Sequence, residues 1–206
     1  MSQQFSIVVV AGLALVGLTG CSSQHTAPKS NLDPAAQAMA DMQVYMQSGT
    51  PGEIHKKMAE GAGEWTTTST MMMPGMPPTV CHGTASTRMT MDGRFAITEV
   101  STPMEGMGTM NGMSIMGYDN VQKKFVGTWI DNMGSGMMQG VGTSTDGGKR
   151  IDWVYTFSCP ITNCQRTMRE VHTHPDKDTL IIESFANDPR TNKEMQCMKL
   201  EAKRKK

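Results

Sequence analysis

The spacing of apolar and polar positions in the first third of the chain is helical. Asp33 and Pro34 are typical of a helix start, with aspartate as the N-cap and proline at the first helical position. Met39, Met42 and Met46 then recur on one face of that helix. This stripe predicts packing against a core rather than metal binding.

A second short helix is predicted directly after the first. Thr50-Pro51-Gly52-Glu53 has the spacing of a capping box, and the helix is expected to continue through Met58. We therefore expect a short helical segment over residues 33–62.

From Gly63 onward the pattern changes to short runs rich in Val, Ile, Thr and aromatic residues, separated by Gly, Asn, Asp and Pro. Such runs predict β-strands joined as antiparallel hairpins. An open meander of so many strands would leave two long unpaired edges, so a closed barrel is favoured. The predicted fold is mainly β: an antiparallel up-and-down barrel over 63–206, preceded by one or two short helices. About ten strands are expected, at 63–72, 79–91, 94–103, 112–118, 123–132, 138–145, 150–158, 165–173, 179–187 and 194–203.

The N-terminus has the features of an export signal. Residues 6–18 form an apolar run that is short for a membrane span and suits a signal-peptide core over residues 1–20, although the first five residues lack lysine and arginine. Leu18-Thr19-Gly20-Cys21 resembles a bacterial lipobox, which makes Cys21 the expected lipidation site. Residues 21–32 are polar and would tether the protein to the membrane. Ser22 resembles the signal for the outer membrane, so we expect a lipid-anchored protein of the cell envelope that faces the periplasm.

Composition changes this picture mainly through methionine. The 206 residues include 22 methionines but only six leucines, so methionine replaces leucine as the common apolar residue. Lysine plus arginine and aspartate plus glutamate both number 19, which gives no basic surface for nucleic acid. The oligomeric state is left open.

Four cysteines remain if Cys21 is lipidated, an even number that favours disulfides in an oxidising compartment. Cys159 and Cys164 bracket the sequence PITN, which predicts a disulfide that closes a hairpin. Whether Cys81 and Cys197 pair is left open.

Several motifs resemble a known bacterial family. They are GEW at 63–65, MDGRF at 91–95, GYDNVQKKFVGTWIDNM at 117–133 and the ending from REVHTHPDKDTLIIESF onward. Together they are similar to the family catalogued as domain of unknown function 1579, over about residues 50–206. The resemblance implies a calycin-like barrel, related to lipocalins and fatty-acid-binding proteins, and it brings no established activity or catalytic residues.

In an up-and-down barrel, alternate loops emerge at the same end, so three methionine groups and the cysteine pair would share one rim. Residues three apart on a strand point to opposite faces, so one hairpin offers only two thioethers per face. Two turns are possible here: one at Asn111-Gly112 would pair Met110 with Met113, and one around Gly106 to Gly108 would pair Met104 with Met110. The candidate ligand or metal residues are Met73, Met76, Met104, Met107, Met110, Met137 and Met138.

Three roles are open for this rim. Methionine could simply fill the barrel, could line a pocket for a small apolar ligand, or could bind Cu(I) as a soft ligand in an exported protein. No other cofactor is expected. The predicted function is non-catalytic binding of a small apolar ligand in or at the mouth of the barrel, with periplasmic copper(I) binding as the alternative.

An enzyme is not favoured, because no nucleophile elbow, phosphate loop, HExxH or dinucleotide motif is present. Trp129 and Asp131 share one strand face and are candidates for the barrel interior. We expect Asp131 to form an ion pair with one of three arginines, Arg88, Arg94 or Arg169. His172 and His174 are expected to be solvated.

Overall fold

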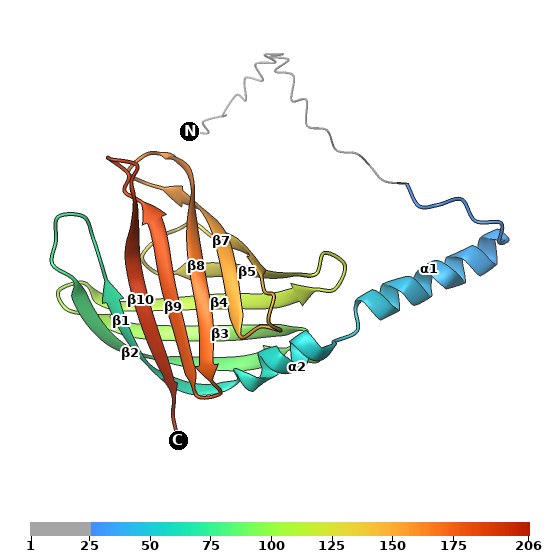
Figure 1. Ribbon diagram of the computed structural model, residues 1–206, viewed down its shortest axis with the longest axis horizontal. Coiled ribbons are helices and arrows are strands. Elements are labelled where there is room, and N and C mark those ends of the chain that lie inside the picture. The colour runs from blue at the N-terminus through green and yellow to red at the C-terminus, as the bar shows by residue number, and fades with distance from the viewer. Residues whose placement is uncertain (1–25) are drawn as a thin grey trace, which may run out of the picture. The chain divides into compact units, whose positions relative to one another are not determined.

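The computed structural model describes residues 26–206, so the predicted signal peptide and Cys21 lie outside the described residues (Figure 1). Two helices precede ten strands, which confirms the predicted fold class. The helices are α1 (Pro34–Ser48) and α2 (Glu53–Glu60). The strands are β1 (Gly63–Met71), β2 (Thr79–Thr90), β3 (Phe95–Met104), β4 (Gly108–Asp119), β5 (Lys124–Asp131), β6 (Met138–Thr143), β7 (Arg150–Cys159), β8 (Cys164–Asp176), β9 (Thr179–Asn187) and β10 (Glu194–Arg204).

The sheet is a closed antiparallel barrel. Each strand pairs with the strands next to it in sequence, and β1 pairs with β10 to complete the ring. The closing pair runs from Trp65 opposite Arg204 to Met71 opposite Met198. Because the ring closes, all ten strands have partners on both sides, and no strand edge is left free.

The barrel is packed tightly at the end that α2 covers. Met58 of α2 joins the buried core together with inward-facing Phe125 and Trp153, which are 2% and 1% exposed. A row of ring contacts runs inward from α2: His55 to Tyr118 at 6.0 Å between centroids, Tyr118 to Phe125 at 5.1 Å, and Phe125 to Trp153 at 6.1 Å. Such edge and tilted contacts stabilise a core beyond the area they bury.

Two turns hold the segment that enters α2. Arg94 Nε donates a hydrogen bond to the carbonyl of Gly49 at 2.9 Å, from the β2–β3 turn. Asn120 Nδ2, from the β4–β5 turn, donates to the carbonyls of Ser48 and Thr50, both at 2.9 Å. These bonds fix where the chain enters the end of the barrel.

The predicted packing of α1 is wrong. Asp33 caps the helix as expected, accepting hydrogen bonds from the backbone N–H groups of Ala35 and Ala36 at 3.0 and 3.1 Å. However, α1 has no buried residue, and Met39, Met42 and Met46 are all exposed. Periodicity identified an apolar face, but it is α2 that contributes to the core. No described helix is long and apolar enough to cross a membrane.

The capping box of α2 is also different from the prediction. The N-cap is Gly52, whose N–H donates to His55 Nδ1 at 3.0 Å. The Thr50 hydroxyl instead donates backward to the carbonyl of Met46 at 2.8 Å. A buried histidine therefore caps this helix where threonine and glutamate were expected.

Candidate functional site

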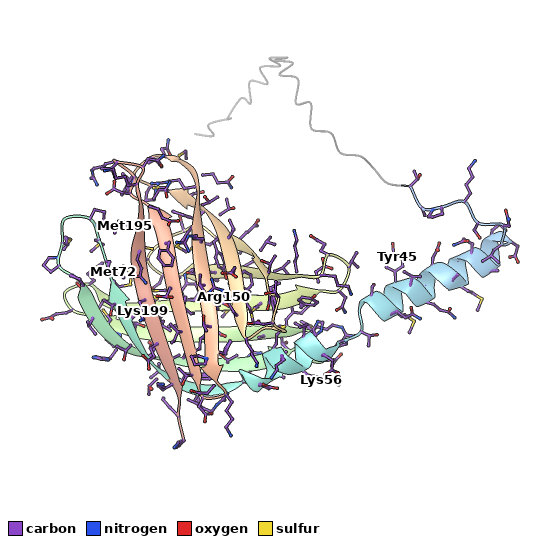
Figure 2. The ribbon with its side chains drawn as sticks, in the orientation of Figure 1. Tyr45, Lys56, Met72, Arg150, Met195 and Lys199 are labelled. Atoms are coloured by element: carbon purple, nitrogen blue, oxygen red, sulfur yellow. The ribbon has the colours of Figure 1, made fainter. Side chains whose placement is uncertain are left out.

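The inner wall of the barrel differs between its two ends. Inward-facing Phe125, Ile151 and Trp153 near α2 are almost completely buried. At the opposite end the inward-facing methionines are half-buried, although smaller inward residues there, such as Ser69 and Thr102, are buried. We call this opposite end the open half. Figure 2 labels Met195 and Met72 near the ends of β10 and β1 that lie away from α2. The methionines whose strand position faces inward there, all half-buried, are Met71, Met104, Met110, Met138, Met195 and Met198.

Inward positions follow from strand alternation and register. Met110 lies opposite Thr102, which is buried, and Met138 lies opposite Trp129. Met138 and Met168 also pack against the buried core cluster. The open half therefore carries several flexible thioether side chains next to the aromatic core.

The seven candidate methionines do not form one cluster. Met104, Met110 and Met138 face inward. The remaining four lie in the loops and are more than half exposed: Met73, Met76, Met107 and Met137. The loops that carry these methionines do lie at one end of the barrel, as predicted. Their side chains, however, are divided between the inner wall and the solvent.

The β3–β4 turn decides the register of the opening methionines. The turn covers residues 105–107, with Met107 N–H bonded to the carbonyl of Met104 at 3.0 Å. Met104 lies opposite Gly108, and Met110 lies opposite Thr102. A turn at Asn111-Gly112 is therefore excluded, and Met104 and Met110 are not direct partners. They are diagonal neighbours on one inner face.

Trp129 and Asp131 lie on the inner wall of the open half, but the partner predicted for Asp131 is wrong. Trp129 Nε1 donates to Asp131 Oδ2 at 2.7 Å, and the N–H of Met133 donates to Oδ1 at 2.9 Å. The expected ion pair with an arginine is not present; Arg169, for example, pairs with Glu194 at 2.8 Å. Two local donors satisfy this carboxylate, so it needs no distant cation.

Gly112 makes room for the Trp129 ring. A Cβ at Gly112 would lie 2.3 and 2.4 Å from Trp129 Cζ2 and Cη2. The indole therefore lies flat over the backbone of β4, where only glycine fits. Sequence reasoning missed this contact because it depends on the register between β4 and β5.

A polar cluster lies deeper in the barrel, between β8 and β9. Glu170 accepts a hydrogen bond from Ser184 Oγ at 2.7 Å and is 2.9 Å from His172 Nε2. The His172 ring is 5.7 Å from the Trp153 ring, and burial of Tyr155 together with the Glu170 charge raises the Tyr155 pKa. The prediction of solvated histidines is wrong, since the His172 side chain is 16% exposed. Burial is the main cause of a lowered pKa of His174, and the charge of the nearby His172 lowers this pKa further.

The predicted disulfide between Cys159 and Cys164 is absent: all four cysteines of the described chain are free thiols. The prediction placed the two residues correctly, because they are direct partners at the end of the β7–β8 hairpin. Their side chains differ, however. Cys159 is buried, whereas Cys164 is exposed and its thiol donates a hydrogen bond to Thr162 Oγ1 at 3.2 Å.

One surface hollow lies outside the barrel. It is a shallow groove of about 620 Å³ across the outer face of β1 to β5. Ser86 lies between the longer Glu64 and Glu99, and the small side chains of Thr84 and Ser101 also line the groove. Alternating outward residues of a twisted sheet give such a groove without any convergent chemistry, so we place the candidate site on the inner wall.

The described residues contain no group of three or more His, Cys, Asp or Glu side chains that could hold a metal ion. Thioether side chains are soft ligands of the kind that suits Cu(I).

Comparison with known families decides the identity at the family level. The model of a family described as "Protein of unknown function (DUF1579)" matches residues 50–204, which include α2 and the whole barrel. The chain belongs to the DUF1579 family. No curated protein matches this DUF1579 chain.

A solved structure supports the DUF1579 barrel. The crystal structure of Rv2717c from M. tuberculosis is similar, with a TM-score of 0.56 over 76% of this chain and 100% of that chain, at 12% sequence identity. At this identity the likeness extends to the fold alone. The helix α1 precedes the part of the chain that the family model matches.

Proposed function

We propose that this protein is a non-catalytic binding protein that holds a small apolar ligand at the open half of its barrel. The observation that carries this proposal is the contrast along the inner wall. Residues such as Phe125 and Trp153 are completely packed near α2, whereas the inward-facing methionines at the other end retain solvent contact.

The chemistry of this wall suits an apolar ligand. Ligand sites are usually apolar with a few polar groups that orient the ligand. Met104, Met110 and Met138 provide the apolar surface, and methionine adapts to ligands of different shape because it is unbranched and polarizable. Trp129, held by Asp131, provides a fixed aromatic face beside them.

A neutral, environment-sensitive dye such as N-phenyl-1-naphthylamine tests the proposal directly. We expect saturable binding, with a change in the emission of Trp129, the one tryptophan that is not buried. Met110→Lys should weaken dye binding by at least about tenfold, because it places a charge on the apolar wall.

Met107→Lys is the matched control, since Met107 lies in the adjoining turn and is 59% exposed. It should bind the dye as the wild type does. Equal binding by the two lysine variants, or no saturable binding by the wild type, would reject the inner wall as the site.

The cellular location belongs to the same proposal. Lipidation at Cys21 would anchor the barrel to the membrane through the polar residues 21–32, facing the periplasm. The ligand would then be a small apolar molecule that an envelope protein can meet.

Copper(I) binding is the second candidate, favoured by Met104 and Met110 as diagonal neighbours on one inner face. Thioethers bind Cu(I) without releasing protons, so the affinity should change little between about pH 5 and 7.

The double substitution Met104→Ile and Met110→Ile keeps the apolar bulk but removes both sulfurs. It should abolish competition with a chromophoric Cu(I) chelator while leaving dye binding intact; the matched control is Met107→Ile.

A further inference from the structure

Cys159 and Cys164 are placed so that they can form a disulfide without movement of the backbone. They are direct partners in the antiparallel ladder, joined by the turn Pro160–Asn163. Opposite residues in such a ladder have Cα atoms about 4.5 to 5.5 Å apart, which is within the range of natural disulfides. The hairpin is therefore compatible with both the dithiol and the disulfide.

Thr162, in the turn between the two cysteines, contacts the exposed thiol. The Cys164 thiol donates a hydrogen bond to Thr162 Oγ1 at 3.2 Å. Cys159 lies among possible donors in the same turn, with Thr162 foremost, followed by Ile161 and Arg166.

These donors favour the thiolate of Cys159 and lower its pKa to about 7. Bonds from Thr162 are the largest contribution. A thiol with a pKa near neutrality is partly ionised at pH 7, and only the thiolate is nucleophilic.

The other two cysteines have different surroundings. Cys81 is buried on the inner wall of β2. Burial is the main cause of a raised pKa of Cys197, and the charge of Glu170 raises this pKa further. They provide internal controls for any thiol chemistry at the hairpin.

We propose that Cys159 and Cys164 form a reversible dithiol–disulfide site that exchanges with small-molecule disulfides. Exposed Cys164 loses its proton to solvent and attacks the external disulfide, which forms a mixed disulfide and releases one external thiolate. The Cys159 thiolate then attacks the Cys164 sulfur and releases the second external thiolate. In total, two protein thiols are oxidised to one disulfide, and the external disulfide is reduced to two thiols.

The test uses the full-length reduced chain, incubated with oxidised glutathione, quenched with acid, alkylated and digested with trypsin. Both cysteines lie on the tryptic peptide 151–166. This peptide should lose two hydrogens and escape alkylation, while Cys81 and Cys197 remain alkylated. Reduced glutathione should reverse the change.

Two variants separate the roles of the cysteines. Cys159→Ser should accumulate a stable glutathione adduct on Cys164, because the resolving thiol is missing. Cys164→Ser should form its adduct on Cys159 at least about tenfold more slowly, because that thiol is buried. Thr162→Val, which keeps the shape without the hydroxyl, should move the half-maximal rate of disulfide formation to higher pH.

The proposal is overturned if the wild type gives no disulfide in peptide 151–166, or if Cys81 and Cys197 oxidise at the same rate as the hairpin pair. An unchanged pH profile in Thr162→Val would overturn the role of Thr162 in ionising Cys159.

Discussion

Glu170 shows how single residues in this barrel can place charge inside an apolar wall. Its carboxylate points inward from β8 and accepts a hydrogen bond from Ser184, which is itself 1% exposed. His172 Nε2 is 2.9 Å from the other carboxylate oxygen, Oε2. Burial of a carboxylate is costly unless its oxygens are hydrogen-bonded, so both partners stabilise the folded state.

Ser184→Ala should lower the free energy of unfolding by roughly 1.5 to 3 kcal/mol, because it removes a hydrogen bond to a buried charged group. Urea denaturation at pH 7 measures this change. Ser158→Ala is the control: Ser158 is an exposed strand serine, so its effect should stay within about 0.5 kcal/mol. Equal stability of the two variants would mean that the bond to Glu170 contributes nothing.

Sequence patterns predicted the position of site residues better than their partners. Alternation placed Trp129 and Asp131 on one face correctly, because it depends only on strand geometry. The partner of Asp131 could not be predicted. Both the indole N–H of a nearby tryptophan and the guanidinium of a distant arginine can donate to a carboxylate, and the sequence does not show which donor lies within reach. The Gly112 contact and the Glu170–Ser184 bond both require the register between neighbouring strands.

At the level of elements, strands were easier to predict than helix packing. Short apolar runs between turn residues predicted all ten strands, because each hairpin is specified locally. The stripe of α1 and the buried face of α2 have the same period, and periodicity does not show which face finds a partner. The turn before β4 is set by Gly106 and Gly108, both with positive φ, which few other residues adopt.

The docking of α2 predicts a pH dependence of stability. Burial lowers the pKa of His55 below its ordinary value, and the same is true of His174. As the pH falls below about 6.5, these histidines take up protons in the unfolded chain before they do so in the folded one. Protonation therefore favours unfolding, and stability should decrease with acidification from pH 7 toward pH 5.

Denaturation midpoints measured over this range in wild type and in His55→Asn provide the test. The variant should be less stable at pH 7, because the hydrogen bond to Gly52 is altered, but its stability should depend less on pH. A variant with the same pH dependence as the wild type would assign the effect to His174 alone.

For the whole molecule, attachment to the membrane is the property with the clearest genetic test. Cys21→Ser should abolish acylation and leave the signal uncleaved by the lipoprotein peptidase, because the thiol carries the lipid. Labelling of cells with a palmitate analogue measures this. Cys197→Ser should retain full labelling; incorporation that persists in Cys21→Ser would refute the lipobox.

Closure of the sheet was predictable at this scale, because ten strands in one open sheet would leave two long edges. The contents of the barrel were not. Methionines at similar spacing became inner wall at Met110 and exposed loop at Met107, since a turn of three residues decides which face each one takes.

The pairing of β1 with β10 has a consequence for the order of folding. The other pairings join neighbours in sequence and can form as local hairpins, but this one joins the two ends of the barrel sequence. Bringing those ends together costs about 2 kcal/mol more chain entropy than closing a short hairpin. Closure is therefore expected as a late and slow step, during which β1 and β10 each present an unpaired edge. A chain caught at that stage can satisfy both edges with another copy of itself, so slow refolding at high concentration favours exchanged dimers and aggregates.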